Sequence, residues 1–338
     1  MIPRPDHKIE IPTTDEYPVR GDFYVPETAS PPGIVVLCHG FKGYKTWGFF
    51  PYVAGRIREA GLAALSIDFS FNGTHPTGGS EDDSSAPKLE PGDRQPLYPR
   101  PDLFRINTIT RERNDLLSVM RFIRAGQLDP HIKTPRSVGL FGHSRGGVVS
   151  FLHAVQHNDV DALCTWSIPD HANIFDARQI ERWRAMGDYD FTNAADGTRL
   201  SVSLRYLDDL ENNIDAFDLA KQATRLRTPH LIVHGETDLA VDVECARVLH
   251  DAEENLDDKQ LLIVRTGHLF GVTYPAQDVT PANKQPHDPG APADAFAKPA
   301  ETTGPDAPPQ TADAPTDVLV KTTDVTVDWF ATHLGKGV

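Results

Sequence analysis

The residues Gly142-His143-Ser144-Arg145-Gly146-Gly147 form the stretch of sequence that decides the fold. They directly follow an apolar run of strand length, Val138-Gly-Leu-Phe141, and they open a segment, 147–157, with the character of a helix. The pattern Gly-x-Ser-x-Gly between a strand and a helix is typical of a nucleophile elbow, a sharp turn that lifts the serine hydroxyl above the sheet edge. The sequence therefore predicts Ser144 as a nucleophile, with the Arg145 backbone N–H at the helix start directed toward a developing oxyanion. The alternative is a glycine-rich turn with an incidental serine.

Two further polar residues follow predicted strands later in the chain. Asp238 comes after the apolar strand His230–Val233, and His268 comes after the strand Gln260–Val264. Catalytic groups of open α/β sheets gather at the carboxyl ends of strands, and the order serine, acid, histidine is the one that follows a nucleophile elbow. We therefore expect His268 to act as the base and Asp238 to orient it. Asp170, one predicted strand earlier, is the rival acid.

A glycine-flanked turn follows the third predicted strand. The run His39-Gly40-Phe41-Lys42-Gly43 comes directly after Gly33–Cys38. A flexible turn at that place can direct the backbone N–H of Phe41 to the same point as that of Arg145, which would give a two-donor oxyanion hole. A plain strand-to-helix turn is the alternative.

Apolar runs and amphipathic segments alternate along most of the chain, which predicts a parallel sheet with helices on both faces. The predicted strands are His7–Ile11, Val19–Val25, Gly33–Cys38, Leu62–Phe69, Ser137–Phe141, Ala162–Ile168, His230–Val233 and Gln260–Val264. The predicted helices are Phe49–Ala60, Phe104–Ala125, Gly146–His157, Val243–Glu254 and Val318–Leu334.

Two stretches interrupt this alternation and divide the chain. Residues 171–227 lack it, so we expect a small cap inserted into a core made of residues 1–170 and 228–338. Residues 276–316 are rich in proline and alanine with a single aromatic residue, and we expect this insertion to be largely disordered because it buries too little apolar surface. Apolar contacts of the cap to an acyl group, or alternatively packing within the cap, are expected from Trp183, Tyr189, Phe191 and Tyr206.

Composition excludes several kinds of partner. Lys and Arg total 33 against 48 Asp and Glu, a formal charge of −15, so nucleic acid and a polybasic membrane surface are not expected partners. No window is apolar enough for a membrane span, and the first residues lack the apolar core of a secretory signal. Three widely spaced cysteines fit a reducing compartment, so we expect a cytoplasmic protein. Nucleotide-binding and metal-binding motifs are lacking, so neither a cofactor nor a metal is expected.

Taken together, the motifs HGFKG, GHSRGG, HGETD and TGH resemble, in order and spacing, those of the α/β-hydrolase superfamily, in particular its dienelactone-hydrolase and cinnamoyl-esterase-like branch. The resemblance covers about residues 18–275 and 318–334. It implies an α/β fold with a doubly wound, mostly parallel eight-stranded sheet and a small inserted cap. By motif, it also implies Ser144 as nucleophile, Asp238 as acid, His268 as base, and Phe41 and Arg145 as oxyanion donors.

The resemblance implies a serine hydrolase that cleaves a small-molecule carboxylic ester through an acyl-enzyme. A peptidase, an amidase or a thioesterase of the same fold is the alternative enzyme, because one fold serves many substrates. A binding protein without catalysis on the same scaffold is an alternative of another class. The intact set of serine, acid and histidine argues against it.

Overall fold

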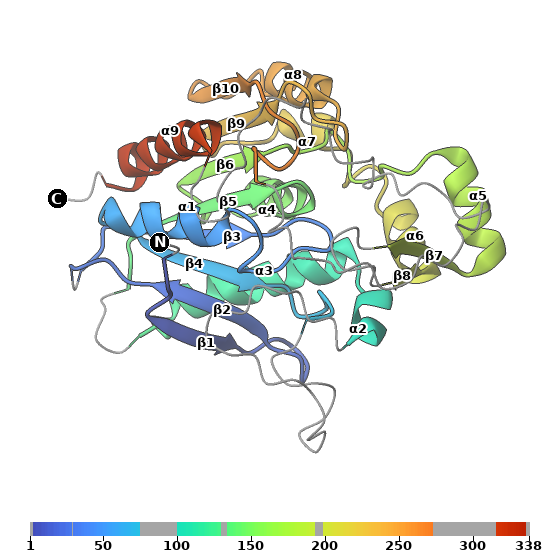
Figure 1. Ribbon diagram of the computed structural model, residues 1–338, viewed down its shortest axis with the longest axis horizontal. Coiled ribbons are helices and arrows are strands. Elements are labelled where there is room, and N and C mark those ends of the chain that lie inside the picture. The colour runs from blue at the N-terminus through green and yellow to red at the C-terminus, as the bar shows by residue number, and fades with distance from the viewer. Residues whose placement is uncertain are drawn as a thin grey trace, which may run out of the picture.

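The computed structural model describes residues 3–28, 30–74, 100–129, 134–192, 199–272 and 316–335 of the 338-residue chain. Within these residues the chain forms one large sheet flanked by helices, with a second group of elements beside it (Figure 1). The predicted insertion 276–316 lies outside the described residues except for Thr316, so its predicted disorder stays a prediction.

The large sheet has eight strands in the order β1-β2-β4-β3-β5-β6-β9-β10. Strands β1 and β2 pair antiparallel, β2 is also antiparallel to β4, and all the other pairs are parallel. The predicted fold class, a mostly parallel eight-stranded α/β sheet, is therefore confirmed. Its strands are β1 (His7–Ile11), β2 (Val19–Tyr24), β3 (Gly33–Cys38), β4 (Ala63–Asp68), β5 (Ser137–His143), β6 (Ala162–Trp166), β9 (His230–Gly235) and β10 (Lys259–Val264).

The central strands are buried on both faces, which explains why they read as unbroken apolar runs. In β3, Ile34 and Val36 belong to one apolar core, whereas Val35 and Leu37 belong to the other. Successive side chains of a strand point to opposite faces, so the two cores lie on the two sides of the sheet.

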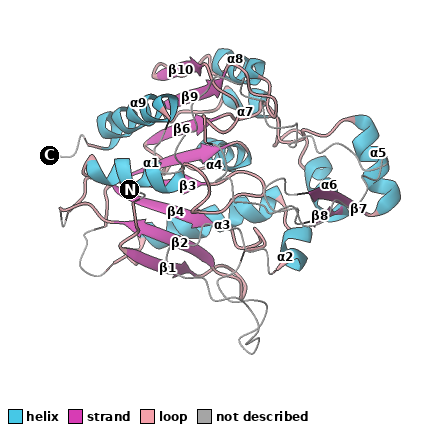
Figure 2. Cartoon of the chain, viewed as in Figure 1, coloured by secondary structure: helices cyan, strands magenta, loops and turns pink. Residues whose placement is uncertain are grey.

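Helices cover both faces of the sheet (Figure 2). Side chains of α1 and α9 fill the core on one face, and those of α3, α4 and α8 fill the core on the other. The helices packed around this sheet are α1 (Phe50–Glu59), α3 (Ile109–Arg124), α4 (Arg145–Gln156), α7 (Leu219–Ala223), α8 (Val243–Ala252) and α9 (Asp317–Leu334). The short helix α2 (Pro101–Arg105) lies to one side of the sheet (Figure 1). In the described ranges, no helix combines the length and the apolar character needed to cross a membrane.

The predicted helix Phe104–Ala125 is instead two helices, α2 and α3. The break falls at Asn107 and Thr108, which are not helical. Thr108 has an extended backbone, and its hydroxyl accepts a hydrogen bond from the Arg111 backbone N–H. It is therefore the N-cap of a new helix, a signal that the apolar periodicity of the segment concealed.

Five elements lie between β6 and β9, where the sequence showed no strand–helix alternation. They are α5 (Ala177–Met186), β7 (Asp188–Thr192), β8 (Arg199–Ser203), α6 (Leu204–Asn212) and α7. The first four gather to one side of the large sheet, next to α2 (Figure 1). Asp209 of α6 accepts hydrogen bonds from the backbone N–H and the hydroxyl of Thr110, at 2.9 and 2.5 Å, so α6 is fastened to the start of α3.

Candidate active site

Ser144 sits at the tight turn between β5 and α4. Its backbone adopts φ 52° and ψ −120°, a strained conformation for a residue with a side chain. A Cβ atom on Gly146 would lie 2.2 Å from the carbonyl oxygen of Cys38, so the closeness of the turn to β3 requires a glycine there. The Ser144 backbone N–H donates to the Trp166 carbonyl oxygen at 2.9 Å and fastens the turn to the neighbouring strand.

Asp238 lies in the turn after β9, with its side chain fully buried. One carboxylate oxygen accepts the backbone N–H groups of Ala240 and Val241, each at 2.9 Å. The other lies 2.8 Å from Nδ1 of His268. Burial alone would raise the pKa of Asp238, but the hydrogen bond and charge of His268 outweigh it and lower that pKa to about 2. Asp238 is therefore a fixed carboxylate.

His268 follows β10 and is held by this carboxylate. Since an ionised carboxylate only accepts hydrogen bonds, the imidazole nitrogen that faces it, Nδ1, carries the proton. In the neutral ring Nε2 is then an unprotonated acceptor, the tautomer that a general base needs. The structure thus brings together the predicted acid and the predicted base.

The rival acid, Asp170, is placed elsewhere. Its carboxylate lies 2.5 Å from Nδ1 of His171, its chain neighbour, and its side chain is partly exposed. Among the described residues, the acid that meets His268 is Asp238.

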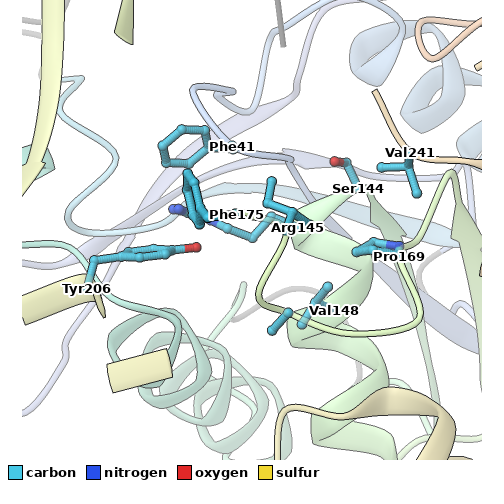
Figure 3. Close-up of a pocket in the computed structure, with 10 residues that line it drawn as sticks. Phe41, Ser144, Arg145, Val148, Pro169, Phe175, Tyr206 and Val241 are labelled. Carbon is cyan, nitrogen blue, oxygen red and sulfur yellow. The ribbon is translucent and has the colours of Figure 1, made fainter. Parts of the chain in front are cut away.

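The turn after β3 approaches the elbow closely. A Cβ atom on Gly40 would lie 3.2 Å from both the Ser144 Cβ and the His143 carbonyl oxygen. The next residue, Phe41, lines a cavity together with Ser144 and Arg145 (Figure 3). Both predicted oxyanion donors therefore belong to the walls of the space in front of the serine. As the first residue of α4, Arg145 has no acceptor for its N–H within the helix.

This cavity is narrow, and its interior has room for little more than a water molecule. Most of its walls are apolar, and several come from the segment between β6 and β9. Its lining residues are Phe41, Ser144, Arg145, Val148, Pro169, Ala172, Ile174, Phe175, Tyr206 and Val241.

Of the four aromatic residues predicted to contact an acyl group, Tyr206 lines the cavity. Trp183 is fully buried, and its indole N–H donates to the Val202 carbonyl oxygen at 3.1 Å. Tyr189 and Phe191 are also buried, 5.0 Å apart between ring centroids, in the same aromatic cluster. Trp183 and Tyr189 therefore pack within the inserted segment, as the alternative expected. Phe191 also packs edge-on against Phe41 of the turn after β3, with 4.7 Å between the ring centroids.

His143 is a residue of the site whose role the sequence did not reveal. Its Nε2 lies 3.0 Å from the His268 carbonyl oxygen, and its ring stacks on Trp47 at 5.8 Å. Burial lowers the pKa of His143 to about 3, so the ring is neutral and donates this hydrogen bond from Nε2. The elbow motif places His143 directly before the nucleophile. Only the structure shows that its imidazole bonds to the loop that carries His268.

Across the described ranges, no three or more His, Cys, Asp or Glu side chains are grouped so that they could hold a metal ion.

No known protein family matches the sequence, and no curated protein matches it either. Solved structures match by fold. The structure of DcsB in complex with its substrate analogue has a TM-score of 0.60 at 15% identity, over 97% of this chain and 99% of that one. Est1E from Butyrivibrio proteoclasticus, with ferulic acid bound, has a TM-score of 0.54 at 20% identity, over 77% and 91%. Dienelactone hydrolase from Anabaena variabilis has a TM-score of 0.51 at 17% identity, over 97% of each chain.

These similarities, together with the strand order, show that the chain has the α/β-hydrolase fold. The fold is of the kind found in dienelactone hydrolase and the Est1E esterase, as the sequence motifs implied.

Proposed function

We propose that the protein is a serine hydrolase that cleaves carboxylic esters through an acyl-enzyme on Ser144. The observation that carries this proposal is the 2.8 Å hydrogen bond between His268 and the buried Asp238, at strand ends on the same sheet as the elbow serine. It supports a charge-stabilised imidazole base, without which a serine hydroxyl is a weak nucleophile.

In the proposed reaction, the Ser144 hydroxyl attacks the ester carbonyl carbon while His268 takes its proton. The backbone N–H groups of Phe41 and Arg145 stabilise the oxyanion that forms. The imidazolium then gives its proton to the departing alcohol, and Asp238 holds the ring in place throughout. Water, activated by the same histidine, attacks the acyl-enzyme and releases the acid.

We assign residues 171–227 the role of a cap over the acyl group, with the core in residues 1–170 and 228–338. Ala172, Ile174, Phe175 and Tyr206 of this segment line the cavity beside Ser144, which supports that role. The mostly apolar walls favour a small-molecule ester as substrate. Among the structures with this fold are a dienelactone hydrolase and esterases, which agrees with ester hydrolysis.

The test is covalent labelling by a fluorophosphonate probe, followed by peptide mapping and by assays on short-chain esters. We expect the label on Ser144 of the wild type and none on the Ser144→Ala variant, which should also lose ester turnover. Circular dichroism of both proteins controls for folding. Turnover that persists in Ser144→Ala, or wild-type protein that neither labels nor turns over, would refute the proposal.

A further inference from the structure

The side chain of Arg145 occupies the cavity but has no part in the reaction proposed above, which uses only its backbone N–H. It is buried, with 9% of its side-chain surface exposed. Among the described residues that line the cavity, it is the only charged one. Figure 3 shows the side chain running from beside Ser144 toward Phe175 and Tyr206.

The guanidinium group is only partly satisfied by its surroundings. Nη2 donates to the carboxylate of Glu112, which is 1% exposed and also accepts the Asn107 side-chain N–H at 2.8 Å. Nε and Nη1 of Arg145 are buried and have no hydrogen-bond acceptor in the described part of the chain. Buried N–H donors are rarely left unpaired, because they lose their hydrogen bonds to water and gain nothing in return.

Aromatic rings near the guanidinium group do not provide acceptors for these N–H donors. Its central carbon lies 4.5 Å from the ring centroid of Phe41 and 5.5 Å from that of Tyr206. Such contacts use the face of the cation, whereas its N–H groups point outward in the plane of the group. The rings therefore leave these two in-plane donors unpaired. Oε2 of Glu112, on the same ion pair, also lacks a partner, and the Tyr206 hydroxyl interacts with the guanidinium group. Pairing Oε2 with one of the two donors still leaves the other for a ligand.

We infer that Nε and Nη1 of Arg145 bind an uncharged oxygen acceptor, such as a ketone, hydroxyl or amide carbonyl, on the acyl group of the substrate. This inference rests on the proposed function, since it names the acyl group that Ser144 would receive. Arg145 and the nucleophile line the same cavity, so the acceptor belongs to an acyl group held there. Phe175 and Tyr206 line the same cavity.

Charge balance selects a neutral acceptor over a carboxylate. Glu112 already compensates the positive charge of Arg145. Burial raises the pKa of Tyr206, so its phenol adds no charge. A second carboxylate would leave an excess negative charge in a buried, mostly apolar space, where an uncompensated charge is strongly disfavoured. It would also face the negative charge that develops on the oxyanion.

The test compares methyl esters of matched shape. The oxo esters are 4-oxopentanoate, 5-oxohexanoate and 6-oxoheptanoate, and each is paired with the ester in which a methyl branch replaces the ketone oxygen. The hemiesters of succinate, glutarate and adipate supply the carboxylates. Rates are divided by those of hydroxide-catalysed hydrolysis, so that differences in intrinsic reactivity cancel. We expect kcat/KM for at least one oxo ester to exceed that of its branched partner and of its carboxylate counterpart by about tenfold or more, or about 1.4 kcal/mol.

Three variants assign the effect to Arg145. Arg145→Lys keeps a positive charge beside Glu112 but removes Nε and Nη1, and Arg145→Met removes the cation. In both, the preference for the oxo ester should fall to within about threefold of unity. Glu112→Gln keeps the guanidinium donors and removes the compensating charge. It should raise the ratio of carboxylate to oxo ester turnover by about tenfold or more. The preference ratio is the readout, because the absolute rates of variants at this position also report on the oxyanion hole.

The outcomes separate this inference from the proposed function. If Ser144-dependent hydrolysis of the branched esters is as fast as that of every oxo ester, or if Arg145→Lys keeps the preference, the inference is wrong and the proposed function stands. A wild type that favours the carboxylates would also overturn the choice of a neutral acceptor. Turnover that survives Ser144→Ala would instead remove the proposed function and the inference with it.

Discussion

The imidazole Nε2 of His143 and the backbone carbonyl oxygen of His268 lie 3.0 Å apart. The two rings are also in contact, with 4.7 Å between their centroids. This hydrogen bond joins the residue before the proposed nucleophile to the loop that carries the proposed base. The two loops leave different strands, so their relative position depends on such a link.

His143 should therefore act as a positioning residue. Replacing it by Phe keeps a buried ring but removes the donor, and we expect kcat to fall by about tenfold to a hundredfold with little change in KM, since a small misplacement of a catalytic group is costly. The measurement is steady-state kinetics on a short-chain ester. His143→Gln, whose side-chain amide can donate to the same carbonyl, should recover most of the activity. Activity that is kept in His143→Phe and lost in His143→Gln would mean that ring packing matters and the hydrogen bond does not.

The proposed nucleophile and base should behave as one unit. We expect Ser144→Ala and His268→Ala each to lower kcat by about 10⁴ to 10⁶, and the double variant to be little slower than either, because each change disables the same step. Kinetics of the three variants on one ester provide the test. Losses that multiply in the double variant would show that the two residues act independently.

Asp238 and Asp170 form a matched pair for testing the acid. Asp238→Asn should lower kcat by about 10⁴, since it favours the wrong tautomer of His268. Asp170→Asn should keep most of the activity, because its carboxylate pairs with His171. Since the pKa of Asp238 is about 2, any loss of activity between about pH 8 and pH 4 comes from another group. The reverse ranking of the two variants in a rate assay would transfer the acid role to Asp170.

The sequence was sufficient to predict the eight-stranded sheet, because β3 and its neighbours are buried on both faces and so are apolar throughout. Ser144, Asp238 and His268 could be predicted as site residues because each follows an apolar run of strand length. The strands β9 and β10 are neighbours in the sheet, so Asp238 and His268, which follow them, lie close enough to form a hydrogen bond.

Contacts between distant segments were beyond the reach of sequence patterns. The break between α2 and α3 depends on capping by Thr108, inside a stretch whose apolar spacing predicts one helix. Trp183 looks like any aromatic residue until its burial against β8 is known. Glu112 lies 33 positions before Arg145, and no motif links the two. Such contacts depend on how distant segments pack together, and no short stretch of the sequence predicts them.

A buried acid in β2 predicts how stability depends on pH. Asp22 is buried, its Oδ1 accepts no hydrogen bond within the described structure, and its closest cation, Lys45 at 3.9 Å, also binds Asp68 at 2.9 Å. Burial raises the pKa of Asp22 from 3.8 to about 6. The native state therefore holds this proton more tightly than the unfolded chain, so stability from this group is present below about pH 4 and is lost as the pH rises to about 6.

Asp22→Asn should remove this loss. Relative to wild type, the variant should gain up to about 3 kcal/mol in the free energy of unfolding between about pH 4 and pH 7, from a shift of about two pKa units. Urea unfolding of both proteins at matched pH values measures the difference, which cancels the titration of other groups. A difference that does not change with pH would mean that Asp22 has the same pKa in the native and unfolded states.

The last prediction concerns the leaving group and separates an esterase from an amidase or peptidase. An ester releases an alkoxide-like group that needs little help, so the proposed serine, histidine and oxyanion donors suffice. An amide requires protonation of a poorer leaving group and a grip on the chain beyond the scissile bond. The cavity beside Ser144 is small and mostly apolar, and Arg145, the only charged residue among its described lining, pairs with Glu112. We expect kcat/KM for an amide to be lower than for the ester of the same acyl group by at least about a hundredfold, or about 2.7 kcal/mol.

The acyl group must be the same in both substrates, so that its fit to the cavity cancels and only the leaving group differs. Ser144→Ala serves as the background control for each. An amide cleaved as fast as its matched ester would favour the amidase or peptidase alternative over the esterase.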